Sequence, residues 1–365
     1  MSDKTHIWWN AMARFCVSPK KLDAILTYFE TPENALTASE KEWSEFYGLA
    51  EMFGFTEKEK QRISGCRKND HEKEFRLLKE KGFNFISKED EAYPEKMRTL
   101  FSAPRFFYYK GELPKGKNIA IIGARNCSGY GSRIAFRLAK ELCESGVGVI
   151  SGLAYGVDRA AHDGALAAGG RTYGVLGCGV DICYPKCHQR VYDNIWETGG
   201  GIISEYPPGT QPLSCFFPQR NRIIAALSDG ILVTEARKKS GTLITVSFGL
   251  EYGKTIYAVP GRSDDVLSEG CIQLIKEGAK PVVTVEDILE DIIEYTGTKK
   301  KRKKVIVPMS PQEQRIAECL RYHPKHIEFL LMETGLDYTE LLHGLELLQS
   351  KGVIRRHGQG YYEML

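Results

Sequence analysis

A glycine-rich turn between a predicted strand and a predicted helix is the segment of this sequence best suited to bind an anion. The apolar run 119–122 ends at Gly123, and a helix is predicted from Ser132. Backbone N–H groups at a helix start favour negative charge, and glycines allow a ligand to approach closely. Arg125 adds a planar guanidinium that fits phosphate oxygens. The predicted phosphate contacts are Gly123, Arg125, Ser128, Gly129, Tyr130 and Gly131.

This turn lacks the features of the familiar nucleotide-binding motifs. A dinucleotide fingerprint needs the spacing Gly-x-Gly-x-x-Gly and an acidic residue about 20 positions later. Here the glycines are at 123, 129 and 131, and the second strand ends in Ser151-Gly152. The sequence also has no Gly-x4-Gly-Lys-Ser/Thr loop. We therefore predict no NAD, FAD or other cofactor, and no ATP hydrolysis of the P-loop type.

A second glycine-flanked turn follows the apolar run 147–151, at the same edge of the predicted sheet. We predict that Ser151 and Gly152 contact the same ligand. His162 follows Asp158 by four residues on the next helix. A packing histidine bonded back to Asp158 is favoured, and a catalytic general base is the alternative.

Two further helix starts carry cations. Arg220-Asn221-Arg222 follows Phe217-Pro218, and cations at a helix start oppose its dipole. This predicts anion binding, with an interdomain salt-bridge cluster as the alternative. The second start is Ser240-Gly241-Thr242, after three consecutive cations at 237–239.

Several anion sites at one sheet edge suit a polyanion better than one small molecule. Doubly wound sheets bind ligands at the carboxyl ends of their strands, where all these turns lie. Aromatic side chains are interleaved with the turns and predict base stacking, with core packing as the alternative. The remaining predicted DNA contacts are Phe217, Arg220, Asn221, Arg222, Ser240, Gly241, Thr242 and Lys186. The aromatic residues are Tyr130, Tyr155, Tyr184, Phe216 and Phe217.

Apolar runs that alternate with helices predict a parallel sheet covered on both faces. The fold class is therefore α/β, with a Rossmann-like, doubly wound, mostly parallel sheet. The strands are predicted at 119–122, 147–151, 173–176, 202–206, 231–235 and 255–259. The helices between them are predicted at 132–143, 157–168, 220–227 and 242–251.

The chain is long enough for several domains. Residues 1–80 form a predicted helical module of the SAM or helix-hairpin-helix type, with helices at 20–28, 37–45 and 56–63. A docking or spacer module is an equally favoured interpretation of these helices. Residues 83–295 form the core, and 296–307 a linker with six consecutive cations at 299–304. Residues 308–365 form a predicted winged helix, with helices at 311–321, 325–333 and 338–350. Its third helix has few cations, which favours contact with protein over duplex DNA.

Composition adds few constraints. Of 365 residues 42% are hydrophobic and 27% charged, and the formal net charge is +3. No apolar run reaches membrane-spanning length, and no signal peptide is evident, which predicts a cytoplasmic protein that does not bind membranes. Four potential zinc ligands lie within eleven residues, at Cys178, Cys183, Cys187 and His188. Buried thiols are favoured there over a zinc site, because no Cys-x-x-Cys pair is present.

These motifs together resemble the DprA/Smf family of DNA-processing proteins. The resemblance extends from about Tyr93 to Ala279. Its motifs, in order, are Gly123–Arg125 with Ser128–Gly131, 151–154 with 156–158 and 161–162, 175–181 with 184–185, 204–209, 217–224, 240–242 and 258–261. The chain departs from the family at His188 and Cys271, where asparagine is common.

The resemblance implies a homodimer that binds single-stranded DNA, protects it and loads RecA onto it during natural transformation. It implies phosphate binding by Arg125 and no catalysis. The alternative is a nucleotide hydrolase of the lysine-decarboxylase-like (LOG) group, or a nucleotide sensor. Ser240-Gly241-Thr242 with Glu251 partly resembles the LOG signature, but the spacing to the glutamate differs.

Overall fold

The computed structural model describes residues 3–100, 102–292, 308–321, 324–357 and 360–364. The chain divides into two compact units, Met1–Tyr295 and Thr296–Leu365. The predicted cationic linker lies outside the described residues. Each unit is therefore described by itself.

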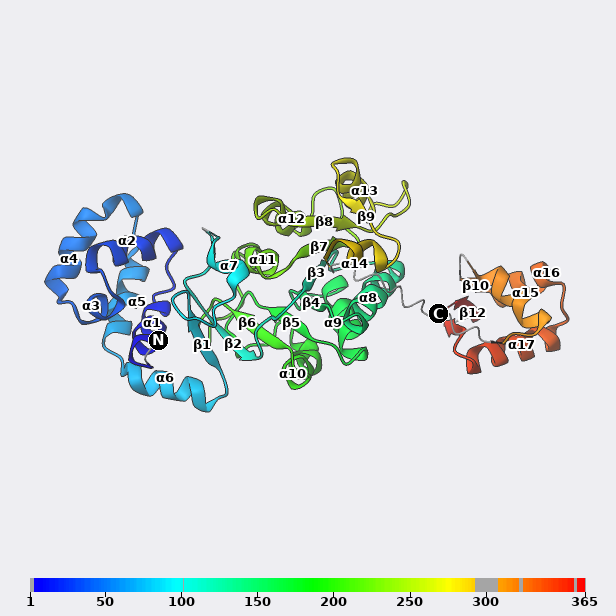
Figure 1. Cartoon of the computed structure of the whole chain (residues 1–365), viewed down its shortest axis with the longest axis horizontal. Helices are drawn as coiled ribbons and strands as arrows, with labels where there is room; N and C mark the ends of the chain where they lie inside the picture. The colour runs from blue at the N-terminus through cyan, green and yellow to red at the C-terminus, as the bar shows by residue number, and fades with distance from the viewer. Residues whose placement is uncertain (1–2, 101, 293–307, 322–323, 358–359, 365) are drawn as a thin grey trace. The chain divides into compact units, whose positions relative to one another are not determined.

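A nine-stranded sheet forms the centre of the first unit, in the order β1-β2-β6-β5-β4-β3-β7-β8-β9 (Figure 1). The seven strands from β6 to β9 in that order are parallel. Six of them match the predicted apolar runs, which confirms the doubly wound α/β fold. The parallel strands are β3 (Asn118–Ile122), β4 (Gly148–Ser151), β5 (Thr172–Val175), β6 (Gly201–Ser204), β7 (Gly230–Val233), β8 (Thr255–Ala258) and β9 (Lys280–Pro281).

Helices cover both faces of this sheet (Figure 1). On one face, apolar residues of α11, α12 and α13 pack with Ala120 and Ile122 of β3. On the other face, α8, α9 and α14 pack with Ile119 and Ile121. Successive residues of β3 thus point to opposite faces, and both faces are buried, which explains its continuous apolar sequence. The helices are α7 (Glu95–Arg98), α8 (Gly129–Glu144), α9 (Val157–Ala167), α10 (Gln189–Glu197), α11 (Phe216–Leu227), α12 (Thr242–Glu251), α13 (Glu269–Lys276) and α14 (Glu286–Ile292), with the 3-10 turn η2 (Lys186–His188).

Helix starts differ from the prediction where the cap residue was misplaced. α8 begins three residues early because Ser128 caps it and accepts a hydrogen bond from the backbone N–H of Gly131 at 3.0 Å. α11 begins at Phe216, so Arg220 lies in the second turn of the helix. The argument that Arg220 and Arg222 oppose the dipole at a helix start is therefore wrong.

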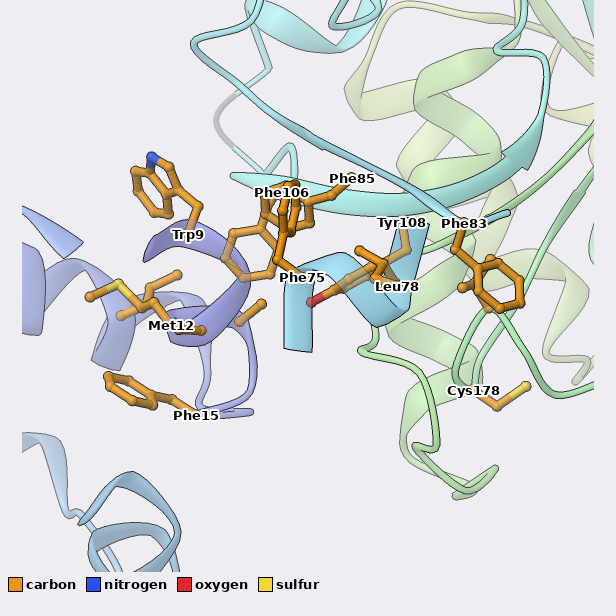
Figure 2. Packing of buried hydrophobic residues seen from close by; sticks show 14 of the residues in the cluster. Trp9, Met12, Phe15, Phe75, Leu78, Phe83, Phe85, Phe106, Tyr108 and Cys178 are labelled. Carbon is orange, nitrogen blue, oxygen red and sulfur yellow. The ribbon is translucent and has the colours of Figure 1, made fainter. Parts of the chain in front are cut away.

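Two antiparallel strands were not predicted and extend one edge of the sheet. β1 (Asn84–Ser87) pairs with β2 (Phe106–Gly111), which pairs with β6. Phe85, Phe106 and Tyr108 pack with the N-terminal helices, while Ile86 and Phe107 point to the other face of the sheet. The hydroxyl of Tyr108 donates to Asn10 at 2.9 Å. Figure 2 shows one continuous apolar cluster there, which includes Trp9, Met12, Phe15, Phe75, Leu78, Phe83, Phe85 and Phe106.

The N-terminal helices pack as part of the first unit. The predicted helix at 37–45 is interrupted, because Ser39 forms a capping box with Glu42 and starts a new helix. The predictions at 20–28 and 56–63 overlap α2 and α5. The elements are α1 (Asp3–Ala13), α2 (Pro19–Phe29), α3 (Pro32–Thr37), α4 (Glu40–Leu49), η1 (Glu51–Phe53), α5 (Glu57–Arg67) and α6 (His71–Glu80).

The second unit has three helices and a small sheet in the order β10-β12-β11. Leu330, Leu341 and Leu345 are fully or almost fully buried in its core. The winged-helix assignment itself stays a prediction. The elements are α15 (Pro311–Leu320), β10 (Lys325–His326), α16 (Ile327–Thr334), α17 (Tyr338–Ser350), β11 (Ile354–His357) and β12 (Tyr361–Met364).

Within the residues described, no helix combines the length and the apolar character that crossing a bilayer requires.

Asp90 connects the first helix to the sheet and generates a testable prediction. Its carboxylate accepts hydrogen bonds from Ser87 N at 2.8 Å and Ser87 Oγ at 2.9 Å, and its Oδ2 lies 2.7 Å from His6 Nε2. Burial tends to raise the pKa of Asp90, but the bonds from Ser87 and His6 outweigh burial and hold the pKa below its ordinary 3.8.

We expect Asp90→Asn to lower the free energy of unfolding at pH 7 by about 1–3 kcal/mol, because buried donors lose a charged acceptor. Because the pKa of Asp90 is lower in the folded state than in the unfolded state, its carboxylate stabilises the fold fully above the ordinary pKa. This stabilisation is lost as the pH falls through the lowered pKa. The difference from wild type should therefore shrink below about pH 4. Urea denaturation at pH 7 and pH 3 measures both effects, with the exposed Asp264→Asn as control. Equal stability of wild type and Asp90→Asn at pH 7 would contradict this role.

Candidate nucleic-acid interface

A pocket of about 470 Å³ lies at the carboxyl ends of β3 and β7. The two strands are neighbours, and the chain continues from β3 to β4 on one side and from β7 to β8 on the other. This is the topological switch point, where doubly wound sheets bind their ligands. The pocket is lined by Ile122, Gly123, Arg125, Ala154, Asp158, Ser214, Phe217, Pro218, Arg220, Asn221, Ile224, Lys239, Ser240, Gly241, Thr242, Ile244 and Thr245.

Arg125 is the exposed guanidinium at the mouth of this pocket. Its Cζ lies 5.5 Å from the ring centroid of Phe217, and Cζ of Arg220 lies 5.9 Å from the same ring. Contact with the ring restricts the guanidinium and leaves its N–H groups available to a ligand. Lys239 also lines the pocket and is exposed.

The start of α8 already holds an anion, and that anion belongs to the protein. One carboxylate oxygen of Glu235 accepts a hydrogen bond from Ser128 N at 2.8 Å, and the other accepts from Ser128 Oγ at 2.5 Å. Glu235 follows β7 and is 2% exposed. The sequence pattern predicted an anion at this helix start but did not identify Glu235, because no local spacing connects residues 107 positions apart.

The side chain of Glu235 leaves no room for a side chain at Gly131. A Cβ atom at Gly131 would lie 2.3 Å from the carboxyl carbon of Glu235. A Cβ atom at Gly152 would lie 2.4 Å from Nη1 of Arg220. Glycine is therefore required at 131 and 152 by neighbours within the protein. Gly129 has more room, since its nearest neighbour would be Arg133 Nη1 at 3.4 Å.

The second turn is also filled from inside, by Asp158. Its carboxylate accepts hydrogen bonds from Gly152 N at 3.1 Å and from Ala154 N at 3.3 Å. Burial raises the pKa of Asp158, while the charge of Arg220 opposes that shift. Arg220 itself donates to the carbonyls of Gly152 at 2.6 Å and of Val175, and burial lowers its pKa. The turn is thus held by a buried pair of opposite charges.

His162 does not bond to Asp158, and that prediction is wrong. Its Nδ1 lies 2.8 Å from Thr172 Oγ1 on β5, because α9 packs that side of the ring against the sheet. The ring is completely buried, and burial lowers its pKa to about 3. His162 is therefore a neutral packing residue, as the favoured interpretation held.

The arginines at 220 and 222 face different surroundings. Arg222 pairs with the carboxylate of Glu205, is 9% exposed and does not line the pocket. The salt-bridge alternative thus describes Arg222, although the pair lies within one unit. Asn221 lines the pocket, and its Oδ1 accepts from Arg220 Nε at 3.2 Å.

The start of α12 also lines the pocket, through Ser240, Gly241 and Thr242. Thr242 Oγ1 donates to the carbonyl of Gly123 at 3.2 Å, which joins this start to the β3 turn. Ser240 Oγ accepts from Thr242 N at 3.2 Å. A Cβ atom at Gly241 would meet nothing within 4 Å, so open space adjoins this backbone.

Other predicted contacts lie outside the pocket lining. Ser151 is fully buried and donates to the carbonyl of Ile121 at 2.7 Å. Lys186 is exposed in η2. Tyr130, Tyr155 and Tyr184 are 45–50% exposed, and each remains a predicted stacking surface.

The cysteine group is dispersed among separate partners. The thiol of Cys178 donates to the carbonyl of Ile182, and that of Cys183 to the carbonyl of Pro185. Burial raises the pKa of these thiols to about 12 and about 11. In the described part of the chain, no three His, Cys, Asp or Glu side chains are grouped to hold a metal ion.

The comparisons with known proteins agree with this geometry. Residues 84–293 match the family described as DNA recombination-mediator protein A. The DNA processing protein DprA of Streptococcus pneumoniae is 43% identical over 204 residues, which cover 55% of this chain and 72% of that protein.

Two solved structures are similar to this chain. The X-ray structure of DprA from S. pneumoniae has a TM-score of 0.65 at 32% identity and covers 81% of this chain and 100% of that one. DNA processing protein A from Helicobacter pylori has a TM-score of 0.52 at 28% identity and covers 57% and 94%. The Helicobacter structure concerns the single-stranded DNA binding mode of that protein.

The packing of Glu235 against α8 generates the next prediction. We expect Gly131→Ala to lower the free energy of unfolding by about 1–3 kcal/mol, because the new methyl group displaces a carboxylate held by two hydrogen bonds. Gly129→Ala, in the same helix turn, should be neutral or slightly stabilising, because alanine favours helix more than glycine does. Thermal or urea unfolding of both variants measures the difference. Equal stability of the two variants would show that Glu235 moves aside freely.

Proposed function

Since the chain belongs to the family of DNA recombination-mediator protein A, we propose that it binds single-stranded DNA through the pocket at the carboxyl ends of β3 and β7. The proposal rests on one observation: the acidic side chains near the pocket are bound within the protein, and the basic ones are exposed. The carboxylates of Asp158 and Glu235 are bound to backbone N–H groups of the turns, whereas Arg125 and Lys239 are exposed. The surface available to a ligand is therefore cationic.

Arg125 is the central phosphate contact in this proposal. Within the described residues, no carboxylate lies within ion-pair distance of its guanidinium, while Arg222 has Glu205 and Arg159 has Asp163. A guanidinium held over a ring is ready to bind two phosphate oxygens at once. Lys239 and the start of α12 also line the pocket and supply further positive potential.

A polynucleotide fits these features better than a free nucleotide. Exposed cations continue beyond the pocket at Arg237 and Lys238, and exposed tyrosines lie on neighbouring turns. A single-stranded chain offers both a phosphate backbone and unstacked bases to such a surface. We propose that the bases stack on Tyr130, Tyr155 and Tyr184, without sequence-specific hydrogen bonds.

The further steps of the proposal come from the family. We propose that the protein protects incoming single-stranded DNA, acts in the cytoplasm as a homodimer and loads RecA in natural transformation. It acts by binding, with no chemical step. The acidic third helix of the second unit, α17, favours a protein contact by that unit.

Binding should show a clear preference and a clear salt dependence. We expect tight binding of a labelled poly-dT oligonucleotide and weak binding of duplex of equal length, with a log–log salt slope near −0.7 per phosphate neutralised. Arg125→Ala should weaken binding and make the slope shallower by about 0.7, because one phosphate contact is lost. Fluorescence anisotropy across a salt series measures both quantities.

The matched control for Arg125→Ala is Arg76→Ala, which removes an exposed arginine of α6 far along the chain from the pocket-lining residues. It should leave the slope unchanged. A slope that is the same in wild type and in Arg125→Ala would place the DNA backbone elsewhere.

The same pocket should not hydrolyse nucleotides. Asp158 is the pocket carboxylate, and its oxygens are bound to Gly152 and Ala154 beside the charge of Arg220. Glu251, which partly resembles the LOG signature, does not line the pocket. Incubation with AMP followed by chromatography should therefore show no free adenine. Release of adenine that depends on Asp158 would favour the hydrolase.

A further inference from the structure

Glu235 holds both ends of the segment that carries Arg125. Its backbone carbonyl accepts a hydrogen bond from Ala124 N at 2.8 Å. Its carboxylate accepts from Ser128 N at 2.8 Å and from Ser128 Oγ at 2.5 Å. The segment between these two attachments consists of residues 125–127. One residue at the end of β7 thus determines where the chain leaves β3 and where it enters α8.

The upstream end of the segment, at Ala124, is also held by residues 156 and 157 at the start of α9. In the described residues, the downstream end, at Ser128, has no such second contact to the sheet. Val157 N donates to the carbonyl of Ala124 at 3.2 Å, and a Cβ atom at Gly156 would lie 2.3 Å from that carbonyl oxygen. Near Ser128, the bonds that tie the segment to the sheet are those to Glu235. The carboxylate is also the anion that the start of α8 requires.

We infer that Glu235 is a positioning residue for DNA binding, which acts by holding Arg125 at the mouth of the pocket. The inference rests on the proposed function, because Arg125 is the phosphate contact there. Glu235 is 2% exposed and does not line the pocket, so it acts through the 125–127 segment and not by contact with DNA.

The direction in which Glu235→Gln changes the DNA affinity distinguishes a positioning role from an electrostatic one. Glu235→Gln keeps the size of the side chain and removes one negative charge from the vicinity of the DNA site. Electrostatics alone predicts tighter binding of a polyanion. A positioning role predicts weaker binding, because the amide offers one accepting oxygen where the carboxylate offers two, and Arg125 loses its fixed place.

The test is a double-mutant cycle for binding of labelled poly-dT by the full chain, with wild type, Arg125→Ala, Glu235→Gln and the double variant. We expect Glu235→Gln to weaken binding by about tenfold when Arg125 is present and by less than about twofold when Arg125 is absent. Glu251→Gln, which makes the same change of charge on the surface of α12, is the control and should bind as wild type or slightly more tightly.

Hydrogen exchange of the DNA-free protein gives a readout that does not depend on DNA. Amides of residues 124–128 should exchange faster in Glu235→Gln than in wild type or Glu251→Gln, because the downstream attachment is weakened. Comparison at a temperature where all variants are folded excludes global unfolding as the cause.

The outcomes distinguish this inference from the proposed function. If wild type binds single-stranded DNA but Glu235→Gln binds like Glu251→Gln, the inference is overturned. An equal loss with and without Arg125 also overturns it, since Glu235 would then act through the general stability of the fold. If wild type fails to bind single-stranded DNA, the proposed function is wrong. The exchange of residues 124–128 then decides whether Glu235 positions Arg125.

Discussion

The carboxylate of Glu235 at the start of α8 is the interaction on which the candidate site depends. A helix start has N–H groups without partners, and here the backbone N–H and hydroxyl of Ser128 are satisfied by a side chain from the neighbouring strand β7. This bond joins β3, α8 and β7 at one point. The position of Glu235 determines the path of the Arg125 turn into α8. It also explains why position 131 is a glycine.

The doubly wound fold usually leaves this helix start open to a ligand phosphate. In this chain the turns after β3 and β4 each bind an internal carboxylate, that of Glu235 in the first and that of Asp158 in the second. An external phosphate must therefore use other donors. Arg125, Lys239 and Gly241 at the start of α12 line the pocket and are exposed. That arrangement suits a long chain passing over the sheet edge.

Sequence reasoning predicted the parts of the fold that depend on local patterns. Continuous apolar runs identified the strands that are buried on both faces, and the range 242–251 coincides with α12. It missed β1 and β2, because their apolar side chains pack against N-terminal helices distant in sequence. It did not identify the carboxylate of Glu235 beside Gly131, since a glycine beside a buried carboxylate has the same local sequence as a glycine beside a phosphate. The sequence also did not indicate that His162 bonds to Thr172 or that Ser128 bonds to Glu235, because each bond joins two different elements of the fold.

The most direct test of this account is a crystal structure of the protein with a short oligo-dT. The account predicts a DNA phosphate within hydrogen-bond distance of the Arg125 guanidinium, on the side of the pocket formed by Lys239 and the start of α12. Glu235 should still accept hydrogen bonds from Ser128. A phosphate bound to the Ser128 backbone, with Glu235 displaced from the start of α8, would contradict it.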